Sequence, residues 1–354
     1  MVYVLILAGG KGTRLYPLSR EKKPKQFLNI INEKSFLRNT VDRVKSLVDI
    51  KNIYIITNKK YKADVIDEID EINEDNVYVE PANKETATCI GLSAIKLLKK
   101  DKDAVMLVLP SDHHIQGEKK FLDTIKVALE IAQKRRGLVT LGIEPTRPET
   151  GYGYIKMGER MYGKMPTYKV DRFTEKPNIE VAKDFLITGS YLWNSGMFVW
   201  RVDVFLREME KYLPKTYKNL MEIYKYIDTD EEETIIDQQY NLIDGISVDF
   251  GIMQKTRKAY VIKCNFEWDD IGSFSALARF FDSYRGNNIK GNTFLEQSEN
   301  CDVFGNKKLI IGFGLKDLII INTDDVLLVM PKDKEQEIKY LVNRLVEDNK
   351  KEYL

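Results

Sequence analysis

The sequence VYVLI at residues 2–6 runs directly into LAGGKGTRLYPLSREKKPKQFL at residues 7–28. An unbroken apolar run of this kind is typical of a strand that is buried on both faces of a parallel sheet. The run stops at a Gly-Gly pair, so we expect the loop that follows to lie at the carboxyl edge of the sheet. Open α/β sheets bind their ligands at that edge.

The loop combines a flexible backbone with positive charge. Gly9, Gly10 and Gly12 allow the backbone to approach a bound group closely and to direct N–H donors at it. The basic side chains of the loop are Lys11, Arg14, Lys22, Lys23 and Lys25. The spacing matches neither the Walker loop nor the G-x-G-x-x-G of dinucleotide-binding folds. We therefore predict a polyphosphate-binding loop of another type, with a tight turn that carries solvated lysines as the alternative.

Composition excludes several classes of protein. The 354 residues include 55 basic and 54 acidic side chains, and a nucleic-acid-binding protein would show a strong basic excess. Cys89, Cys264 and Cys301 lie far apart and form no C-x-x-C pair, so we expect buried thiols rather than a zinc site or a disulfide framework. Met1 is followed at once by the predicted first strand, with no basic n-region or cleavage site, so we expect no leader segment, and no apolar run approaches membrane-spanning length. We expect a cytoplasmic protein with no nucleic-acid partner and no membrane partner.

The order of predicted elements indicates two domains. Up to about residue 143, apolar runs alternate with amphipathic helical segments, which predicts a parallel sheet with helices on both faces. After about residue 285, short apolar strands separated by Asn, Gly and Asp turns predict a small β-helix or β-roll, and a charged helix begins at about Asp333. We expect a catalytic domain at 1–285 and a short β-helix-like domain with a terminal helix at 286–354.

Two aspartates are candidate metal ligands. Asp112 lies just past the apolar run AVMLVLP at 104–110, after Ser111, which places it at the ligand edge of the sheet. Asp270, in FEWDDIGSF, lies at a predicted strand-to-helix junction from which it could reach the same edge. Mg²⁺ takes one or two carboxylates together with water and phosphate oxygens, so this pair would suffice. The alternatives are a turn or cap role for Asp112 and a helix cap at Asp269, beside the second candidate.

A further set of polar residues predicts contacts with a sugar phosphate. In FTEKP, Glu175 could accept hydrogen bonds from sugar hydroxyls while the Lys176 ammonium meets a phosphate. An exposed surface ion pair is the alternative. In YLWNSGMF, Asn194 and Gly196 interrupt an apolar strand, and a buried asparagine needs partners that a sugar hydroxyl could supply.

Taken in order, these segments resemble the sugar-1-phosphate nucleotidyltransferases, and in particular the guanylyltransferases of that family. The stretch at 7–28 resembles the family signature, and its PKQF is closer to the guanylyltransferases than to the thymidylyl- and uridylyltransferases. Further matching segments are EPANKETA at 80–87, PSDHHI at 110–115, PTRPETGYGYI at 145–155, FTEKP at 173–177, WNSGMF at 193–198 and WDDIG at 268–272. The resemblance spans nearly the whole chain. It implies an α/β, Rossmann-like (GT-A-like) mixed sheet of the nucleotide-diphospho-sugar transferase type, followed by a short left-handed β-helix-like tail.

The resemblance also implies a reaction. GMP would pass from GTP to mannose 1-phosphate, giving GDP-mannose and pyrophosphate, by in-line attack of the sugar phosphate on the α-phosphorus. Arg14 and Lys25 would be catalytic, Mg²⁺ would lie between Asp112 and Asp270, and the enzyme would be a homodimer. The alternatives are a nucleotidyltransferase for another hexose 1-phosphate or nucleotide, and a non-catalytic sugar-nucleotide sensor. The joint presence of these four side chains favours an enzyme.

Carried over residue by residue, the resemblance implies two sets of binding residues. The nucleotide-binding set is Leu7, Ala8, Gly9, Gly10, Gly12, Thr13, Glu80, Pro81, Asn83, Thr86, Ala87 and Ser111. The sugar-phosphate-binding set is Gly151, Tyr152, Gly153, Glu175, Lys176, Asn194, Ser195 and Gly196. Lys84 and Glu85 stand where bacterial members commonly have Arg and Asn, which leaves the details of the base-binding loop open. The chain ends at Leu354, so we expect no isomerase domain of the kind that some members carry.

Glu80 predicts the choice of base. It ends the predicted strand NVYVE, at the place where the thymidylyl- and uridylyltransferases resemble one another in having Gln. An ionised carboxylate only accepts hydrogen bonds, and guanine presents two adjacent donors, N1–H and the 2-amino group. The residue therefore predicts a preference for guanine, with a cap of the following segment as the alternative.

Overall fold

The computed structural model describes residues 1–10 and 12–354, so the charge expected of Lys11 lies outside the described residues. The chain folds into two compact units, and neither of them is a continuous stretch of sequence. The first unit comprises Met1–Gly9, Thr40–Ser111 and Ile115–Trp268, and the second comprises Gly10–Asn39, Asp112–His114 and Asp269–Leu354. Each unit has a hydrophobic core of its own.

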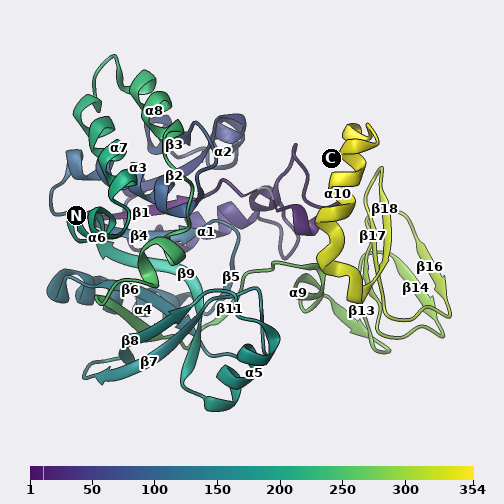
Figure 1. The fold of residues 1–354 in the computed structure, drawn as a ribbon. Helices are drawn as coiled ribbons and strands as arrows, with labels where there is room; N and C mark the ends of the chain where they lie inside the picture. The colour runs from purple at the N-terminus through teal and green to yellow at the C-terminus, as the bar shows by residue number, and fades with distance from the viewer. Residues whose placement is uncertain (11) are drawn as a thin grey trace. The chain divides into compact units, whose positions relative to one another are not determined.

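The first unit is built on a nine-stranded sheet with the order β3-β2-β1-β4-β9-β6-β10-β8-β7 (Figure 1). Its strands are β1 (Val2–Leu7), β2 (Ile53–Asn58), β3 (Val77–Glu80), β4 (Val105–Pro110), β6 (Leu138–Ile143), β7 (Tyr154–Met161), β8 (Thr167–Thr174), β9 (Tyr191–Arg201) and β10 (Ala259–Lys263). β1 pairs in parallel with β2 and with β4, which confirms the central buried strand expected from VYVLI. β9 runs antiparallel between β4 and β6, so the sheet is mixed, as the resemblance implied.

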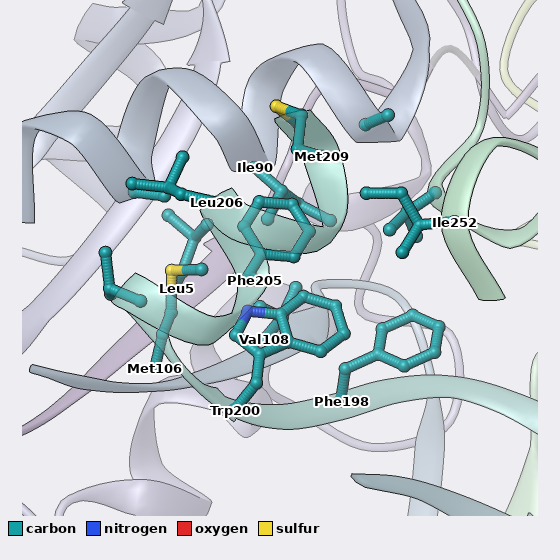
Figure 2. Packing of buried hydrophobic residues seen from close by; sticks show 14 of the residues in the cluster. Leu5, Ile90, Met106, Val108, Phe198, Trp200, Phe205, Leu206, Met209 and Ile252 are labelled. Carbon is teal, nitrogen blue, oxygen red and sulfur yellow. The ribbon is translucent and has the colours of Figure 1, made fainter. Parts of the chain in front are cut away.

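Helices pack against this sheet and bury its apolar side chains. They are α2 (Lys62–Glu68), α3 (Glu85–Lys100), α4 (Glu118–Arg135), α5 (Ile179–Thr188), α6 (Val202–Tyr212), α7 (Pro214–Tyr226) and α8 (Glu232–Asn241). Figure 2 shows Trp200 of β9 beneath Phe205 of α6, and the two rings stack with centroids 4.7 Å apart. A Cβ atom at Gly91 of α3 would lie 2.5 Å from Leu220 of α7, so a glycine there allows these two helices to approach closely.

The second unit contains the C-terminal strands. They are β12 (Asp282–Tyr284), β13 (Asn287–Lys290), β14 (Thr293–Glu296), β15 (Asp302–Phe304), β16 (Ile310–Phe313), β17 (Leu318–Asn322) and β18 (Leu327–Pro331). β13, β15 and β17 stack in parallel register, and β14 pairs in parallel with β16, which is the stacking of coils in a β-helix. At one corner, Gly291 has a φ of 98°, and a Cβ atom there would collide with the Gly305 carbonyl oxygen. The expected β-helix-like tail is confirmed.

The core of the second unit joins the two ends of the chain. Leu15, Tyr16 and Leu28, from the stretch after β1, are buried together with Ile319 of β17 and Ile338. Ile338 begins α10 (Ile338–Glu347), which lies beside β17 and β18 (Figure 1). The stretch that follows β1 is thus built into the same compact unit as the C-terminal tail.

Shorter elements complete the chain. They are α1 (Phe36–Val44), α9 (Phe274–Ala278), the paired strands β5 (His114–Gln116) and β11 (Glu267–Asp269), the π-helical turn η6 (Asp249–Met253), and the 3₁₀ turns η1 (Thr13–Leu15), η2 (Lys25–Phe27), η3 (Ile50–Asn52), η4 (Lys59–Tyr61), η5 (Glu74–Asn76), η7 (Lys332–Glu337) and η8 (Lys351–Tyr353). All three cysteines are free and buried, as predicted. Among the helices of residues 1–10 and 12–354, none is both long and apolar enough to cross a membrane.

Candidate functional site

The loop after β1 leaves the sheet with its first backbone groups already bonded. Ser111 N–H donates to the Leu7 carbonyl at 3.0 Å, and Ala8 N–H donates to Ile56 of β2 at 2.8 Å. The Ala8 carbonyl accepts the Thr57 hydroxyl at 2.9 Å. Residues 7 and 8 of the predicted nucleotide-binding set therefore anchor the start of the loop.

The following turn presents the two basic candidates in different ways. Gly12 has a φ of 62°, and a Cβ atom there would lie 2.6 Å from Lys25 Cβ, so a glycine lets the two ends of the loop meet. Thr13 and Arg14 continue into η1. The Arg14 side chain is exposed. Within residues 1–10 and 12–354, its guanidinium forms no hydrogen bond and no ion pair. Arg14 is therefore available to an anion.

Lys25 has the opposite environment, because its side chain is buried. The Nζ atom donates to Asp112 Oδ2 at 2.7 Å and to the backbone carbonyl of Asp270 at 2.5 Å. Three predicted site residues from distant parts of the chain thus meet at one ammonium group. All three belong to the second unit.

The charge of Asp112 is maintained by this contact. Burial alone would raise the pKa of Asp112, but the Lys25 ammonium and His113 outweigh it and hold the pKa below its ordinary value. The carboxyl is therefore ionised at neutral pH. The Lys25 bond engages Oδ2, and an ionised carboxylate has further lone pairs, so Asp112 keeps acceptor capacity for a second cation or donor.

Asp270 and Asp269 are both held by local hydrogen bonds. Asp270 Oδ1 accepts the Gly272 N–H at 3.0 Å, and Asp269 Oδ1 accepts the Ile271 N–H at 2.8 Å. The alternative in which Asp269 caps the following helix is wrong, because Ser273 is the N-cap of α9. Asp269 instead forms an ion pair with Arg279.

In the first unit, Glu80 ends β3 as predicted, and its carboxylate is held in place. The buried Tyr240 of α8 donates its hydroxyl to Glu80 Oε2 at 2.7 Å. The other oxygen, Oε1, lies 3.0 Å from the position that a Cβ atom would take at Gly9. Burial raises the pKa of Glu80 to about 6, and the Tyr240 hydrogen bond acts against this rise. Glu80 is therefore a largely ionised acceptor at neutral pH with a fixed orientation.

The remainder of EPANKETA is tied to a loop of the first unit. Thr86 Oγ1 accepts the Val248 N–H at 2.8 Å, and Ala87 N–H donates to the Ile246 carbonyl at 3.1 Å. Pro81 and Asn83 are exposed. Lys84 Nζ donates to the Asn241 carbonyl at 3.1 Å, and Glu85 has a φ of 63° at the start of α3. Ser111, in the same unit, is buried, and its carbonyl accepts the Thr40 hydroxyl at 3.2 Å.

A bulge in β9 places the side-chain amide of Asn194 beside the carboxylate of Asp249. The register between β6 and β9 shifts between Thr140 and Gly142, and Gly196 adopts a φ of 69°. Asn194 Nδ2 donates to Asp249 Oδ1 at 2.8 Å. The neighbouring Ser195 is buried, and its hydroxyl donates to the Leu141 carbonyl at 2.7 Å, so Ser195 stabilises the bulge itself.

Glu175 lies at the end of β8 with one oxygen that lacks a partner among the described residues. This oxygen, Oε2, is buried, and a Cβ atom at Gly153 would collide with it. Burial and the negative charge of Asp249 raise the pKa of Glu175 to about 7. The exposed Lys176 approaches the other oxygen, Oε1, at 3.4 Å.

Tyr152 packs against two aromatic side chains of the first unit. The Tyr152 ring lies 5.2 Å from Trp193 and 5.2 Å from Trp268, in edge-to-face contacts. The Tyr152 carbonyl accepts the Lys176 N–H at 3.2 Å, and Gly151 N–H donates to the Glu149 carboxylate at 3.1 Å. The predicted sugar-phosphate set is therefore brought together within the first unit.

The sequence alone did not identify two residues that hold predicted site residues in place, Asp249 and Tyr240. Asp249 follows the predicted helices in SVDFG, where a lone acid within an apolar stretch was the available signal. Tyr240 lies in the last turn of α8 and carries no local signal, because only its partner Glu80, 160 residues away, gives its hydroxyl a role.

Comparisons with known proteins agree along the whole chain. A family model described as nucleotidyl transferase matches residues 3–286, and one described as a MannoseP isomerase/GMP-like beta-helix domain matches residues 291–345. A mannose-1-phosphate guanylyltransferase of Klebsiella pneumoniae is 36% identical over 100% of this chain and 76% of its own length. The corresponding Escherichia coli K12 protein is 34% identical over 99% of this chain and 75% of its own length. The crystal structure described as mannose-1-phosphate geranyltransferase from Thermus thermophilus has a TM-score of 0.86 and 30% identity, and covers 97% of this chain and 99% of its own.

Proposed function

The chain belongs to the nucleotidyl transferase family and, within it, groups with the mannose-1-phosphate guanylyltransferases, and we propose that it transfers GMP from GTP to mannose 1-phosphate, giving GDP-mannose and pyrophosphate. The observation that carries the proposal is the buried Lys25 ammonium, which meets Asp112 and the Asp270 carbonyl. A buried cation between two segments that follow strands is suited to phosphate chemistry. The family resemblance expected from the sequence is confirmed.

The protein needs no nucleophile of its own in this reaction. A phosphate oxygen of mannose 1-phosphate attacks the α-phosphorus of GTP in line, and pyrophosphate leaves. Catalysis then depends on positioning and on stabilising the charge of the transferring group. Arg14 is exposed and has no anionic partner among the described residues, and Lys25 is preorganised by two acceptors. These two cations supply the charge stabilisation.

Asp112 and Asp270 are suited to Mg²⁺. The carboxyl of Asp112 is ionised, and both residues offer hard oxygen donors beside the same lysine. The described residues contain no group of three or more acidic, histidine or cysteine side chains that could hold a metal, and this pair is the donor set that we propose. Mg²⁺ accepts such a site because water and substrate phosphates complete its coordination. When bound, the ion neutralises charge on both phosphorylated reactants.

The first unit supplies the groups that distinguish the base and the sugar. The Glu80 carboxylate accepts hydrogen bonds from N1–H and the 2-amino group of guanine, supported by its fixed orientation on Tyr240. Glu175 and Asn194 contact the mannose hydroxyls, supported by the buried Glu175 Oε2, which has no partner in the part of the chain that the structure describes. Asp249 holds the Asn194 amide in place.

A homodimer is part of the proposal. Phe294 of β14 and Ile311 and Phe313 of β16 are 57%, 70% and 68% exposed, although all three are apolar. Phe294 and Ile311 are cross-strand neighbours, so these side chains form one patch. Exposed apolar patches often mark subunit contacts. The mass in solution, from light scattering, should be twice 41.1 kDa, and a monomer at all concentrations would refute this part.

A pyrophosphate-release assay over a grid of nucleoside triphosphates and sugar 1-phosphates tests the reaction. GTP with mannose 1-phosphate should give the highest kcat/KM, and a different best pair would replace the proposed substrates. Binding of GDP-mannose without any pyrophosphate release would favour the sensor. The matched control is Lys316→Ala, which removes an exposed ion pair with Glu299 in the tail and should leave the rates unchanged.

A further inference from the structure

Arg20 lies between the two catalytic candidates in the chain, and it is bonded to the C-terminal tail. Its Nη1 and Nη2 atoms donate to the two carboxylate oxygens of Asp325, each at 2.6 Å. Nη2 also donates to Thr323 Oγ1 at 3.0 Å, and Nε donates to the Pro17 carbonyl at 3.0 Å. A guanidinium with this fork geometry fixes position and direction together.

The charge on this pair is stable over the working range of pH. The hydrogen bonds from Arg20 lower the pKa of Asp325 to about 2. The Arg20 side chain is 17% exposed and that of Asp325 is 47% exposed. An ion pair with one partner this exposed contributes little to the free energy of unfolding. Its geometric effect on the loop can therefore be separated from an effect on stability.

The same part of the loop is also covered by apolar residues of the tail. Leu15 and Tyr16 are buried in one cluster with Ile319, Ile321 and Ile338, from β17 and α10. Lys25, which follows Arg20 in the chain, packs closely against Gly12. A Cβ atom added at Gly12 would lie 2.6 Å from Lys25 Cβ. The two ends of the loop therefore contact each other at Gly12 and Lys25. Its outer turn, residues 15–20, contacts the C-terminal tail.

We propose that Arg20 is a positioning residue, and that its bidentate bond to Asp325 makes the C-terminal tail a part of the apparatus that aligns Arg14 and Lys25 on the phosphates. This inference rests on the proposed function. Without the Arg20 fork, the outer turn is held by the apolar contacts of Leu15 and Tyr16, which are non-directional and do not fix its rotation about the contact between Gly12 and Lys25. Displacing a catalytic group by about 1 Å can cost about a hundredfold in rate.

Asp325→Asn tests the proposal, because it retains the size of the side chain and removes one of the two acceptor oxygens. The expected result is a fall in kcat of about tenfold to a hundredfold, with a smaller change in KM and an unchanged Tm. Arg20→Lys should behave similarly, since an ammonium cannot form the fork. Asp325→Glu retains both acceptors and should keep kcat within about threefold of the parent. A parental kcat in Asp325→Asn would overturn the inference.

The control is Glu299→Gln, which breaks the Glu299–Lys316 ion pair of the same tail without touching the loop. It should leave kcat unchanged, and a fall equal to that of Asp325→Asn would overturn the specific role of Arg20.

Hydrogen–deuterium exchange gives a second readout that does not depend on turnover. Peptides covering residues 12–25 should exchange faster in Asp325→Asn than in the parent, because the Leu18 and Ser19 amides are bonded within this turn to the Leu15 carbonyl. Unchanged exchange there would overturn the inference. An inactive parent would instead refute the proposed function, and the exchange result would still decide whether the tail holds the loop.

Discussion

Replacing Glu80 by glutamine should narrow the preference for GTP over ITP. In the parent, the Tyr240 hydroxyl donates to Glu80 Oε2 at 2.7 Å, and under the proposed function the carboxylate accepts hydrogen bonds from the donors of guanine. ITP lacks the 2-amino group, so its complex leaves an acceptor of a buried carboxylate without a partner. Glutamine presents one oxygen and one NH₂ group, and the NH₂ group cannot accept a hydrogen bond from either donor of guanine.

The size of the effect follows from the charge on the acceptor. A hydrogen bond to a charged group contributes about 1.5 to 3 kcal/mol, which corresponds to about tenfold to a hundredfold in kcat/KM. The parent should therefore favour GTP over ITP by at least about tenfold, and Glu80→Gln should reduce that ratio to about threefold or less. The assay is pyrophosphate release with each nucleotide under subsaturating conditions. An unchanged GTP-to-ITP ratio would refute the role of Glu80.

The pH dependence of the same ratio provides an internal check. Glu80 has a pKa of about 6, above its ordinary value, so it is ionised above that pH and gains a proton below it. Protonation replaces an acceptor by a donor that faces the donors of guanine, so the preference for GTP should decline as the pH falls through about 6. Tyr240→Phe removes the hydrogen bond that lowers this pKa, so the midpoint should move to higher pH. A midpoint that stays in place would show that Tyr240 does not act on the carboxylate.

Three further outcomes follow from the structure. Lys25→Ala and Arg14→Ala should each lower kcat by about a hundredfold or more with an unchanged circular dichroism spectrum, because each removes a charge that stabilises the transferring phosphate; rates near the parent would contradict the assignment. Asp112→Asn should raise the Mg²⁺ concentration needed for half-maximal rate, since an amide is a poorer ligand for a hard cation, and an unchanged Mg²⁺ titration would exclude Asp112 as a ligand. Asp249→Asn removes a negative charge that raises the pKa of Glu175 above its ordinary value, so the pH midpoint of the KM for mannose 1-phosphate should fall from about 7, and a fixed midpoint would argue against coupling of the two carboxyls.

Local pattern was enough to predict several strands and the places where candidate site residues follow them. The apolar run before Gly9 became β1, the turn after β4 carries Asp112, and FTEKP ends a strand with Glu175. These features depend on periodicity, turn residues and side-chain chemistry, all of which act over a few residues and can be found in the sequence itself. The short, regularly spaced strands after residue 285 also indicated the β-helix-like tail, and the family resemblance added the mixed sheet.

Tertiary structure alone decided which of these residues meet. β9 enters the sheet antiparallel between β4 and β6, and this pairing brings Thr140 of β6 to the Asn194 amide, whose oxygen accepts the Thr140 hydroxyl at 3.1 Å. Lys25 bonds to a carboxylate 87 residues away, and Tyr240 to one 160 residues away. Arg20 reaches a partner 305 residues along the chain. Contacts of this kind depend on which apolar faces bury one another over the whole chain, and no local window of sequence contains both partners.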